Sequence, residues 1–556
     1  MSTISTKSRN NRQKSARWQP PPPKPTDSGS NAAIGEISDR AWYISSAAIL
    51  FVGAFLRLFK LTLVPLHHDE GVNGNFLVTL VRDGKYFYDP QNYHGPTLYY
   101  FSAIIPWIVR FFGGKVAGDN YGLTTFNIRL ITVVFGVATI WLALTLRKRI
   151  GTIGALSAAG LIAISPGAVY LSRYFIHESL FVFFTLAIVV AALKYFETGR
   201  GLYLILASIS AALMVATKET WIMNGPVLVI ACISTGLYFW LRERLAGGSA
   251  GQDSLADRWR ATIERLGGGI PILTIALTAF AVFIVVAVLF YSSFFTNYPK
   301  GVNDALKTLN LWRQRTHEHE HPWWQYIYWL LWEEGAVMVL GGFGALIALW
   351  RADNRMALFL AQWSFGLLAA YSLVGYKTPW ISLNFIVPLA LTSGYTLEVV
   401  YQKLREFQQP LFFILIPVLL VGLCGYQLYQ LNFVHYDDDQ LPYVYAHTKR
   451  PMLDMIDQIE SIAQKNGTGT DTGIAIVSPD YWPLPWYFRN YKKVGYYSQI
   501  VPTTEPIIIG SEAQEEQLKV TYGDRYDMLK SDTDDGAYPL RPGVDLVLYV
   551  RRDVKR

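Results

Sequence analysis

The sequence predicts a polytopic α-helical membrane protein that ends in a C-terminal α/β domain. Three observations support this fold class. Of the 556 residues, 51% are apolar and only 16% are charged, whereas soluble domains contain about 25% charged residues. Long apolar runs recur as far as residue 430, and a helix that crosses a bilayer needs roughly 20 such residues. Beyond residue 430 the charge rises and the apolar runs shorten, as in a water-soluble domain.

Eleven apolar runs are predicted to span the membrane, and they are 42–63, 127–146, 151–172, 178–196, 201–217, 221–241, 268–292, 324–350, 355–373, 380–400 and 410–430. The run 96–113 contains Pro106 and Arg110, so it is predicted to lie in the membrane interface. With this assignment the basic loops share one side with the basic N-terminus, as the positive-inside rule requires. We therefore expect a plasma-membrane protein with a cytoplasmic N-terminus and an extracytoplasmic C-terminus.

Composition divides the chain into three parts. Residues 1–40 are polar and basic and are predicted to be a disordered cytoplasmic tail. Residues 41–430 form the transmembrane domain, whose first external loop, 64–126, is long enough to predict a function. Residues 431–556 are predicted to form the extracytoplasmic α/β domain, because "GIAIVS", "EPIIIG" and "DLVLYV" are typical of strands and alternate with helical stretches. The sequence contains no nucleic-acid-binding motif.

Two histidines and two carboxylates, His67, His68, Asp69 and Glu70, follow the first apolar run. A solvated loop can have the same composition. A carboxylate that faces a partly dry cavity can instead take a proton from a hydroxyl group. The two histidines could neutralise the carboxylates, bind a metal or form hydrogen bonds. We predict that Asp69 is a general base and that Glu70 orients or binds the acceptor.

Four further loops on the same predicted side carry ionisable residues at a helix end. Five such loops on one face predict a functional site more strongly than any one of them alone. Arginine and lysine can bind phosphate oxygens, although a snorkelling arginine or a local Lys–Glu pair would give the same pattern. An aromatic ring can stack on a sugar. The predicted substrate-binding residues in these loops are Arg173, His177, Glu178, Lys218, Glu219, Lys377 and Trp380.

The stretch "HEHEHPWW" begins at His317. In an extended segment alternate residues share one side, so His317, His319 and His321 could bind a metal together. Imidazole and carboxylate ligands would suit zinc or manganese. A charged loop that gates a pocket would have the same composition. The sequence therefore leaves open whether a divalent metal is bound, and it indicates no other cofactor.

These motifs resemble those of the GT-C glycosyltransferases, and within them the branch of protein O-mannosyltransferases and aminoarabinose transferases. Asp69 and Glu70 match the acidic pair in the first external loop of that branch. The stretch "YHGPTLYYF" is similar to its "HPPLYY" motif, which implies a substrate-binding role for His94. "SRYFIHES" occupies the place of the second acidic motif, and "YKTPW" and "DYWPLPWYFRN" look like those of a bacterial and archaeal subgroup found near flippase genes. The "HEHEH" stretch departs from the branch.

The resemblance covers most of 40–430 and implies a GT-C fold of about eleven transmembrane helices plus in-plane helices. It also implies a membrane glycosyltransferase that moves a sugar from a polyprenyl-phosphate donor to a hydroxyl of a protein, lipid or glycan by inverting displacement on the external face. Arg173, Lys218 and Lys377 would then meet the lipid phosphate.

Three alternatives stay open beside this interpretation. The first is a non-catalytic flippase-associated membrane protein, which could keep the same motifs. The second is a transporter of lipid-linked glycans, which would carry its ionisable groups near the membrane midplane, whereas here they cluster at one face. The third is an oligosaccharyltransferase, but the C-terminal domain contains no WWD-like motif. For the glycosyltransferase, the expected partners are membrane lipid, a polyprenyl-phosphate-linked sugar and an acceptor that the sequence does not identify.

Overall fold

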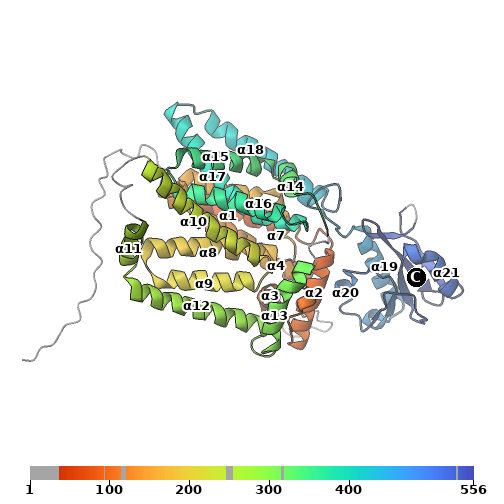
Figure 1. Ribbon diagram of the computed structural model, residues 1–556. Coiled ribbons are helices and arrows are strands. Elements are labelled where there is room, and N and C mark those ends of the chain that lie inside the picture. Colours follow the sequence, from red (N-terminus) through yellow and green to blue (C-terminus); the bar gives the residue numbers. More distant parts are fainter. Residues whose placement is uncertain are drawn as a thin grey trace, which may run out of the picture.

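The computed structural model describes residues 37–92, 94–113, 121–245, 255–314, 319–533 and 536–555. A bundle of long helices forms one part of the molecule, and a mixed α/β domain forms the other (Figure 1). The two parts meet where helix α2 (His68–Asp83) contacts the short helix α20 (Leu484–Tyr487).

Seven helices in the described residues are long and apolar enough to cross a membrane, and the number is nine when each of two bent pairs counts as one span. The continuous ones are α1 (Asp39–Leu58), α4 (Thr125–Leu144), α8 (Glu178–Thr198), α10 (Trp221–Leu245), α12 (Gly269–Tyr291), α17 (Leu383–Glu406) with its leading turn η3 (Pro379–Ser382), and α18 (Phe412–Tyr429) with its closing turn η4 (Gln430–Val434). The bent pairs are α6 (Thr152–Ile164) with α7 (Pro166–Ser172), and α14 (Gln325–Glu333) with α15 (Gly335–Arg351).

Each of the eleven predicted spans corresponds to one helix or to one bent pair. Helices α9 (Gly201–Val215) and α16 (Arg355–Ser372) are not among the candidate spans, so the number eleven stays a prediction. Helix α3 (Thr97–Gly113) is not among them either, and its in-plane position also stays a prediction. The other helices of this part are η1 (Pro90–Asn92), α5 (Arg147–Ile150), α11 (Leu255–Arg265) and α13 (Lys300–Gln314).

Two of the predicted spans are broken, and the two breaks meet. The Ser165 hydroxyl accepts a hydrogen bond from the Ala168 amide and caps α7, which begins with Pro166. Proline lacks the amide hydrogen that would continue α6, and the chain bends there by 58°. The second break lies at Glu334, where the bend is 113°. The Glu334 carboxylate accepts hydrogen bonds of 2.7 Å from the Ser165 hydroxyl and the Gly167 amide, so each break stabilises the other.

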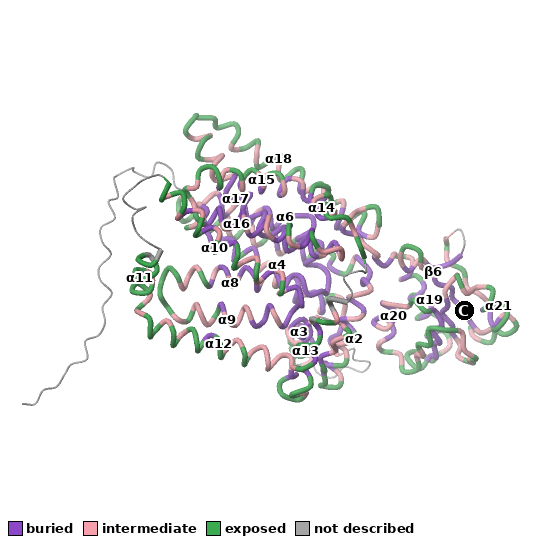
Figure 2. The backbone as a smooth tube through the Cα atoms, in the orientation of Figure 1, coloured by how far each residue is buried: buried purple, intermediate pink, exposed green. Residues whose placement is uncertain are grey.

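Burial divides the helices into inner and outer ones (Figure 2). In the most apolar window, 83% of the residues are buried in the η3–α17 span but only 6% in α12. The outer helices therefore expose many leucine, isoleucine, valine and phenylalanine side chains. Contiguous apolar surface of this extent is rare on proteins that are surrounded by water. Lipid chains would cover it without a hydration penalty, as in a multi-pass membrane protein.

The C-terminal domain is a mixed sheet covered by helices on both faces. In the part of the chain that the structure describes, its strands follow the order β2 (Lys493–Tyr496), β1 (Gly473–Ile476), β3 (Ile507–Ser511), β6 (Val544–Arg551) and β4 (Tyr526–Leu529), and β5 (Tyr538–Arg541) also pairs with β6. Strand β1 is parallel to β2 and β3, and β6 is antiparallel to its neighbours. Helix α19 (Pro451–Lys465) packs on one face and α21 (Glu515–Tyr522) on the other.

The three predicted strands are β1, β3 and β6, so the predicted C-terminal α/β domain is confirmed. Two short turns, η5 (Gly469–Asp471) and η6 (Glu512–Gln514), complete its elements. The predicted domain boundaries at residues 40 and 430 stay predictions.

Helix α2 is held between the bundle and the C-terminal domain. The ring of Trp486 lies against Gly74, where an added Cβ would approach the ring to 2.6 Å, so a larger residue would push α20 away. The backbone amide of Leu66 donates a hydrogen bond of 3.0 Å to the Tyr487 hydroxyl. These contacts fix the first turn of α2 relative to both parts of the molecule, and the candidate site lies at this turn.

Candidate active site

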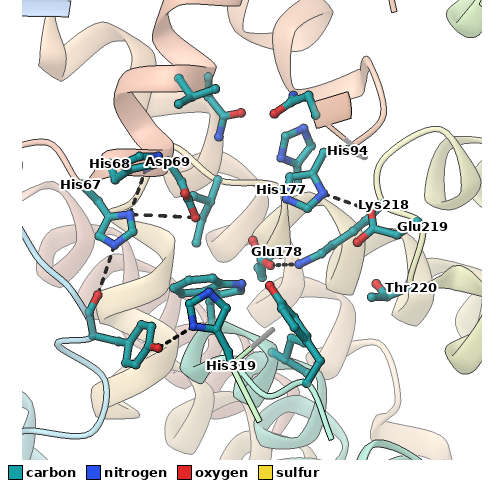
Figure 3. Close-up of a pocket in the computed structure, with 18 of the residues that line it drawn as sticks. His67, His68, Asp69, His94, His177, Glu178, Lys218, Glu219, Thr220 and His319 are labelled. Atoms are coloured by element: carbon teal, nitrogen blue, oxygen red, sulfur yellow. Dashed lines mark hydrogen bonds and ion pairs between the residues drawn. The ribbon is translucent and has the colours of Figure 1, made fainter. Parts of the chain in front are cut away.

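A cavity of about 470 Å³ opens where the start of α2, several interhelix loops and the linker to the C-terminal domain meet (Figure 3). Eight of the predicted site residues line it, namely Asp69, His94, His177, Glu178, Lys218, Glu219, His319 and Trp380. These residues come from loops that are far apart in the sequence. Their convergence fits the expectation that the loops share one end of the bundle.

Asp69 lies in the first turn of α2, and 40% of its side chain is exposed. The Asp69 amide donates a hydrogen bond of 3.1 Å to Nδ1 of His67, and Nε2 of His67 donates one of 3.1 Å to the Tyr445 carbonyl. These two contacts assign His67 the neutral form with its proton on Nε2. Oδ2 of Asp69 lies 3.9 Å from this unprotonated Nδ1 of His67 (Figure 3), and among the described residues no donor is within hydrogen-bond distance of the carboxylate. This carboxylate is therefore free to accept a proton from a bound hydroxyl.

Glu70 is fully buried and does not line the cavity. Its two oxygens accept hydrogen bonds of 2.7 and 2.6 Å from Nε and Nη2 of Arg129. The same carboxylate accepts hydrogen bonds of 2.9 and 2.7 Å from the amides of His67 and Phe175. Glu70 thus joins the start of α2 to α4 and to the loop before α8. The predicted contact with an acceptor would require Glu70 in the cavity wall, whereas it lies behind that wall.

Lys218 and Glu178 form a buried ion pair in the wall, beside the hydrogen-bonded pair of His94 and Glu219 (Figure 3). Nδ1 of His94 lies 3.0 Å from Oε2 of Glu219. Burial lowers the pKa of Lys218, but the charges of Glu178 and Glu219 outweigh burial and hold this pKa above its ordinary value. Burial raises the pKa of Glu219, but His94 and Lys218 outweigh it and hold this pKa below its ordinary value. Lys218 therefore stays cationic and Glu219 anionic at neutral pH.

His177 is a neutral acceptor in the same wall. Its Nε2 donates a hydrogen bond of 3.1 Å to the Gly95 carbonyl, and its ring packs on His94 with 4.8 Å between centroids. Burial, reinforced by His94 and Lys218, holds the pKa of His177 well below its ordinary value. Its Nδ1 is buried and has no hydrogen-bond partner among the described residues. The unpaired nitrogen can therefore accept a hydrogen bond from a hydroxyl of a bound sugar or acceptor.

Two predicted phosphate ligands, Arg173 and Lys377, do not line the cavity. The Arg173 guanidinium donates hydrogen bonds of 3.0, 2.6 and 2.8 Å to three backbone carbonyls at the end of α1. Lys377 is buried, and its ammonium donates to two backbone carbonyls, one of them 3.2 Å away. Burial also lowers the pKa of Lys377. Backbone oxygens thus already accept most of the hydrogen bonds that these two side chains can donate.

The histidine-rich loop contributes His319 to the cavity wall, where Nδ1 lies 2.8 Å from the Tyr445 hydroxyl. His321 does not line the cavity, and its ring packs on Trp329 with 5.5 Å between centroids. His317 lies outside the described residues. Within the described ranges, no group of three or more His, Cys, Asp or Glu side chains is arranged to hold a metal. The predicted site at His317, His319 and His321 stays a prediction.

Several wall residues were not predicted, among them Tyr371, Tyr376, Tyr445 and Arg541. Arg541 belongs to β5 of the C-terminal domain. Its Nη2 lies 2.5 Å from Oδ1 of Asp480, and its Nη1 donates a hydrogen bond of 3.3 Å to the Trp482 carbonyl. No local motif marks this arginine, because only the docking of the C-terminal domain brings it to the cavity.

Comparison with known proteins identifies the architecture. A family model described as dolichyl-phosphate-mannose-protein mannosyltransferase matches residues 103–250, which include the loops of Arg173 and Lys218. The crystal structure of ArnT from Cupriavidus metallidurans bound to undecaprenyl phosphate matches over 92% of this chain and 98% of that chain, with a TM-score of 0.61 and 14% identity. This chain has the GT-C fold.

Structures from Archaeoglobus fulgidus show the same GT-C architecture. The oligosaccharyltransferase tethered with an acceptor peptide matches over 90% of this chain and 74% of that chain, with a TM-score of 0.53 and 13% identity. AglB in complex with an inhibitory peptide and a dolichol-phosphate matches over 89% of this chain and 73% of that chain, with a TM-score of 0.50 and 14% identity. No curated protein matches the sequence.

The comparisons confirm the predicted GT-C fold, the likeness to the mannosyltransferase and ArnT branch and the multi-pass membrane architecture. They also support the predicted class of protein, a membrane glycosyltransferase. The matched family segment ends well before the C-terminal domain and begins after Asp69, so the roles of the individual residues depend on the geometry of the cavity.

Proposed function

We propose that this GT-C protein transfers a sugar from a polyprenyl-phosphate donor to an acceptor hydroxyl and inverts the anomeric configuration. The observation that carries the proposal is a single cavity whose wall contains the accessible carboxylate of Asp69 and the buried cation of Lys218. One ArnT structure contains undecaprenyl phosphate, and one AglB structure contains a dolichol-phosphate. Both ligands are phosphates of long isoprenoid lipids, which supports the same class of donor here.

In the proposed reaction Asp69 takes the proton of the acceptor hydroxyl, and the hydroxyl oxygen attacks the anomeric carbon. The bond from this carbon to the phosphate oxygen breaks, and its electron pair leaves with the lipid phosphate. Negative charge grows on the departing phosphate, so a cation fixed in a water-poor wall stabilises the transition state. Lys218 meets this requirement because Glu178 and Glu219 keep it protonated. The indole of Trp380 offers an aromatic face to the sugar.

A transporter of lipid-linked glycans is the alternative that predicts another position for the site. Its polar groups would lie near the membrane midplane. Here the cavity lies at the ends of the helices. His177 directly precedes α8, and Thr220, which directly precedes α10, is also in the wall. This end position favours chemistry at a membrane surface.

The reaction can be tested with wild-type protein in nanodiscs that contain polyprenyl-phosphate hexoses. Release of polyprenyl phosphate should depend on an added acceptor, and the product should have the inverted anomeric configuration. Retained configuration would overturn the single displacement. Donor binding without release over a panel of sugars and hydroxyl acceptors would instead favour the non-catalytic membrane protein.

Removal of the Lys218 charge is expected to weaken donor binding by about ten- to a hundred-fold, because a charge-assisted contact contributes about 1.5–3 kcal/mol. The change is best made as Lys218→Met with Glu178→Gln, since Lys218→Met alone would leave a buried carboxylate without a counter-charge. Affinity for undecaprenyl phosphate measures the effect. The control is Lys300→Gln, which removes a cation that is 72% exposed and outside the cavity. Equal affinity of the double variant and the wild type would exclude Lys218 as the phosphate ligand.

We infer that the cavity and the C-terminal domain lie on the extracytoplasmic side of the plasma membrane and that the N-terminus lies in the cytoplasm. The basic loops at the other end of the bundle support this orientation. In a Cys232→Ser background, Lys85→Cys should react with a membrane-impermeant maleimide in intact cells. Gln409→Cys should react only after permeabilisation. The reverse labelling pattern would invert the orientation.

A further inference from the structure

A second cavity, of about 720 Å³, lies at the other end of the same helices. Helix α10 begins after Thr220 in the first cavity and carries Arg242 in the second, and α16 runs from Arg355 in the second to Tyr371 in the first. At 1.5 Å per helical residue, these separations correspond to about 33 and 24 Å. The hydrocarbon core of a bilayer is about 30 Å thick. The two cavities therefore lie at opposite ends of the bundle, separated by a distance close to the thickness of this core.

The wall of the second cavity is strongly basic. Its basic residues are Lys148, Arg149, Arg242, Arg351 and Arg355, and its acidic residues are Glu243 and Asp353. Each acidic residue has an arginine partner, since Arg355 lies 3.1 Å from Glu243 and Arg351 lies 2.7 Å from Asp353. Arg149 pairs at 2.6 Å with Glu197, which does not line the cavity.

Two cations of this cavity have no acidic partner. Among the described residues, Lys148 forms no ion pair, and Arg242 donates a hydrogen bond of 2.9 Å to the Trp350 carbonyl but pairs with no carboxylate. Both side chains belong to exposed residues at the rim. The wall therefore carries an excess of positive charge that no group of the described chain neutralises.

Two further features suit an anion that is attached to a lipid. Helix α16 begins in the cavity, with Asn354 as its N-cap, so its free amide groups and dipole add partial positive charge. Phe239 and Met356 line the wall as buried residues, and the exposed apolar surface beside it is the indole of Trp350, which is 86% exposed. An exposed tryptophan is typical of the level of the lipid headgroups. The cavity thus offers cations to a phosphate and apolar contacts to the chains that follow it.

We propose that this cavity binds the phosphate group of an anionic phospholipid in the leaflet opposite to the candidate active site. A zwitterionic headgroup should bind more weakly, because it carries a cation of its own, which the cationic wall repels. A soluble phosphate gains the charge contacts but not the apolar ones. The site is independent of the proposed transfer reaction, since none of its residues lines the first cavity.

The test compares two double variants of the full-length protein that remove the same charge. Lys148→Gln with Arg242→Gln changes the cavity, whereas Arg200→Gln with Lys403→Gln removes two basic residues at the same end of the bundle but outside the cavity. Binding of dioctanoyl phosphatidylglycerol, dioctanoyl phosphatidylcholine and glycerol 1-phosphate is measured by native mass spectrometry. Thermal unfolding without lipid checks that both variants are folded.

Wild-type protein should bind phosphatidylglycerol more tightly than the other two probes. The cavity variant should bind phosphatidylglycerol about twenty-five-fold more weakly, because each of the two basic side chains that it lacks contributes about fivefold near the membrane surface. The control variant should stay within about twofold of wild type. Equal losses of phosphatidylglycerol affinity in the two variants would show that general surface charge, and not this cavity, causes the effect. Preferential binding of phosphatidylcholine or of glycerol 1-phosphate would overturn the assigned ligand.

Discussion

Turnover of the Asp69→Asn variant is expected to fall by about 10²–10⁴-fold, the usual contribution of a positioned general base. Asparagine keeps the size of the side chain but cannot take the proton of an acceptor hydroxyl. The first turn of α2 should persist, because His67 accepts its hydrogen bond from the backbone amide of residue 69 and not from the carboxylate side chain. The loss should therefore appear in kcat of sugar transfer, with donor affinity and thermal unfolding close to wild type.

Asp83→Asn is the matched control, because Asp83 is an exposed residue at the far end of the same helix. It should transfer sugar at the wild-type rate. A wild-type rate in Asp69→Asn would remove Asp69 from the mechanism. A loss that is accompanied by an equal loss of folded protein would assign Asp69 to the stability of α2 instead.

The Glu70→Ala variant is expected to lose about 3–5 kcal/mol of unfolding free energy, because it leaves the Arg129 guanidinium buried without a counter-charge. It also removes the acceptor for the amides of His67 and Phe175. Denaturant or thermal unfolding of the purified protein measures this loss. Activity should fall as well, since the turn that carries Asp69 is no longer tied to α4.

A second variant separates anchoring from acceptor binding. Glu70→Leu with Arg129→Met removes both charges together and should recover part of the stability that Glu70→Ala loses, because no buried charge then lacks a partner. If Glu70→Ala kept its unfolding free energy but bound acceptor poorly, the interpretation from sequence would hold and the anchoring role would be wrong.

The helical spans could be predicted from sequence because the bilayer imposes a length and a polarity on each of them. Helix α12, with a mean hydropathy of 3.0, is the clearest example. The break at Pro166 could also be predicted from the sequence in principle, since proline favours the first position of a helix. The break at Glu334 could not, because the residue that contacts it there, Ser165, lies 169 residues away in the sequence.

The candidate site was predictable in part for a similar reason. The loops of Asp69, Lys218 and His319 could be grouped because helices of equal length return the chain to the same side. Which side chain of a loop enters the cavity depends on the neighbours it meets. Arg173 meets the carbonyl groups at the end of α1, and Glu70 meets Arg129. These partners turn both residues away from the cavity, and no periodicity in the sequence indicates them.

The sequence by itself determined the elements of this protein, because hydrophobic length and strand or helix pattern are local properties. It also determined which chemistry was available at one end of the bundle, since Asp69 and Lys218 follow from their positions next to apolar runs. Only the tertiary structure decided which ionisable groups anchor the fold and which remain accessible. The same packing brings Arg541 of the C-terminal domain to the wall of the cavity that Asp69 also lines. The physical reason is that a buried charge must find its partner across the fold, and such partners are far apart in the sequence.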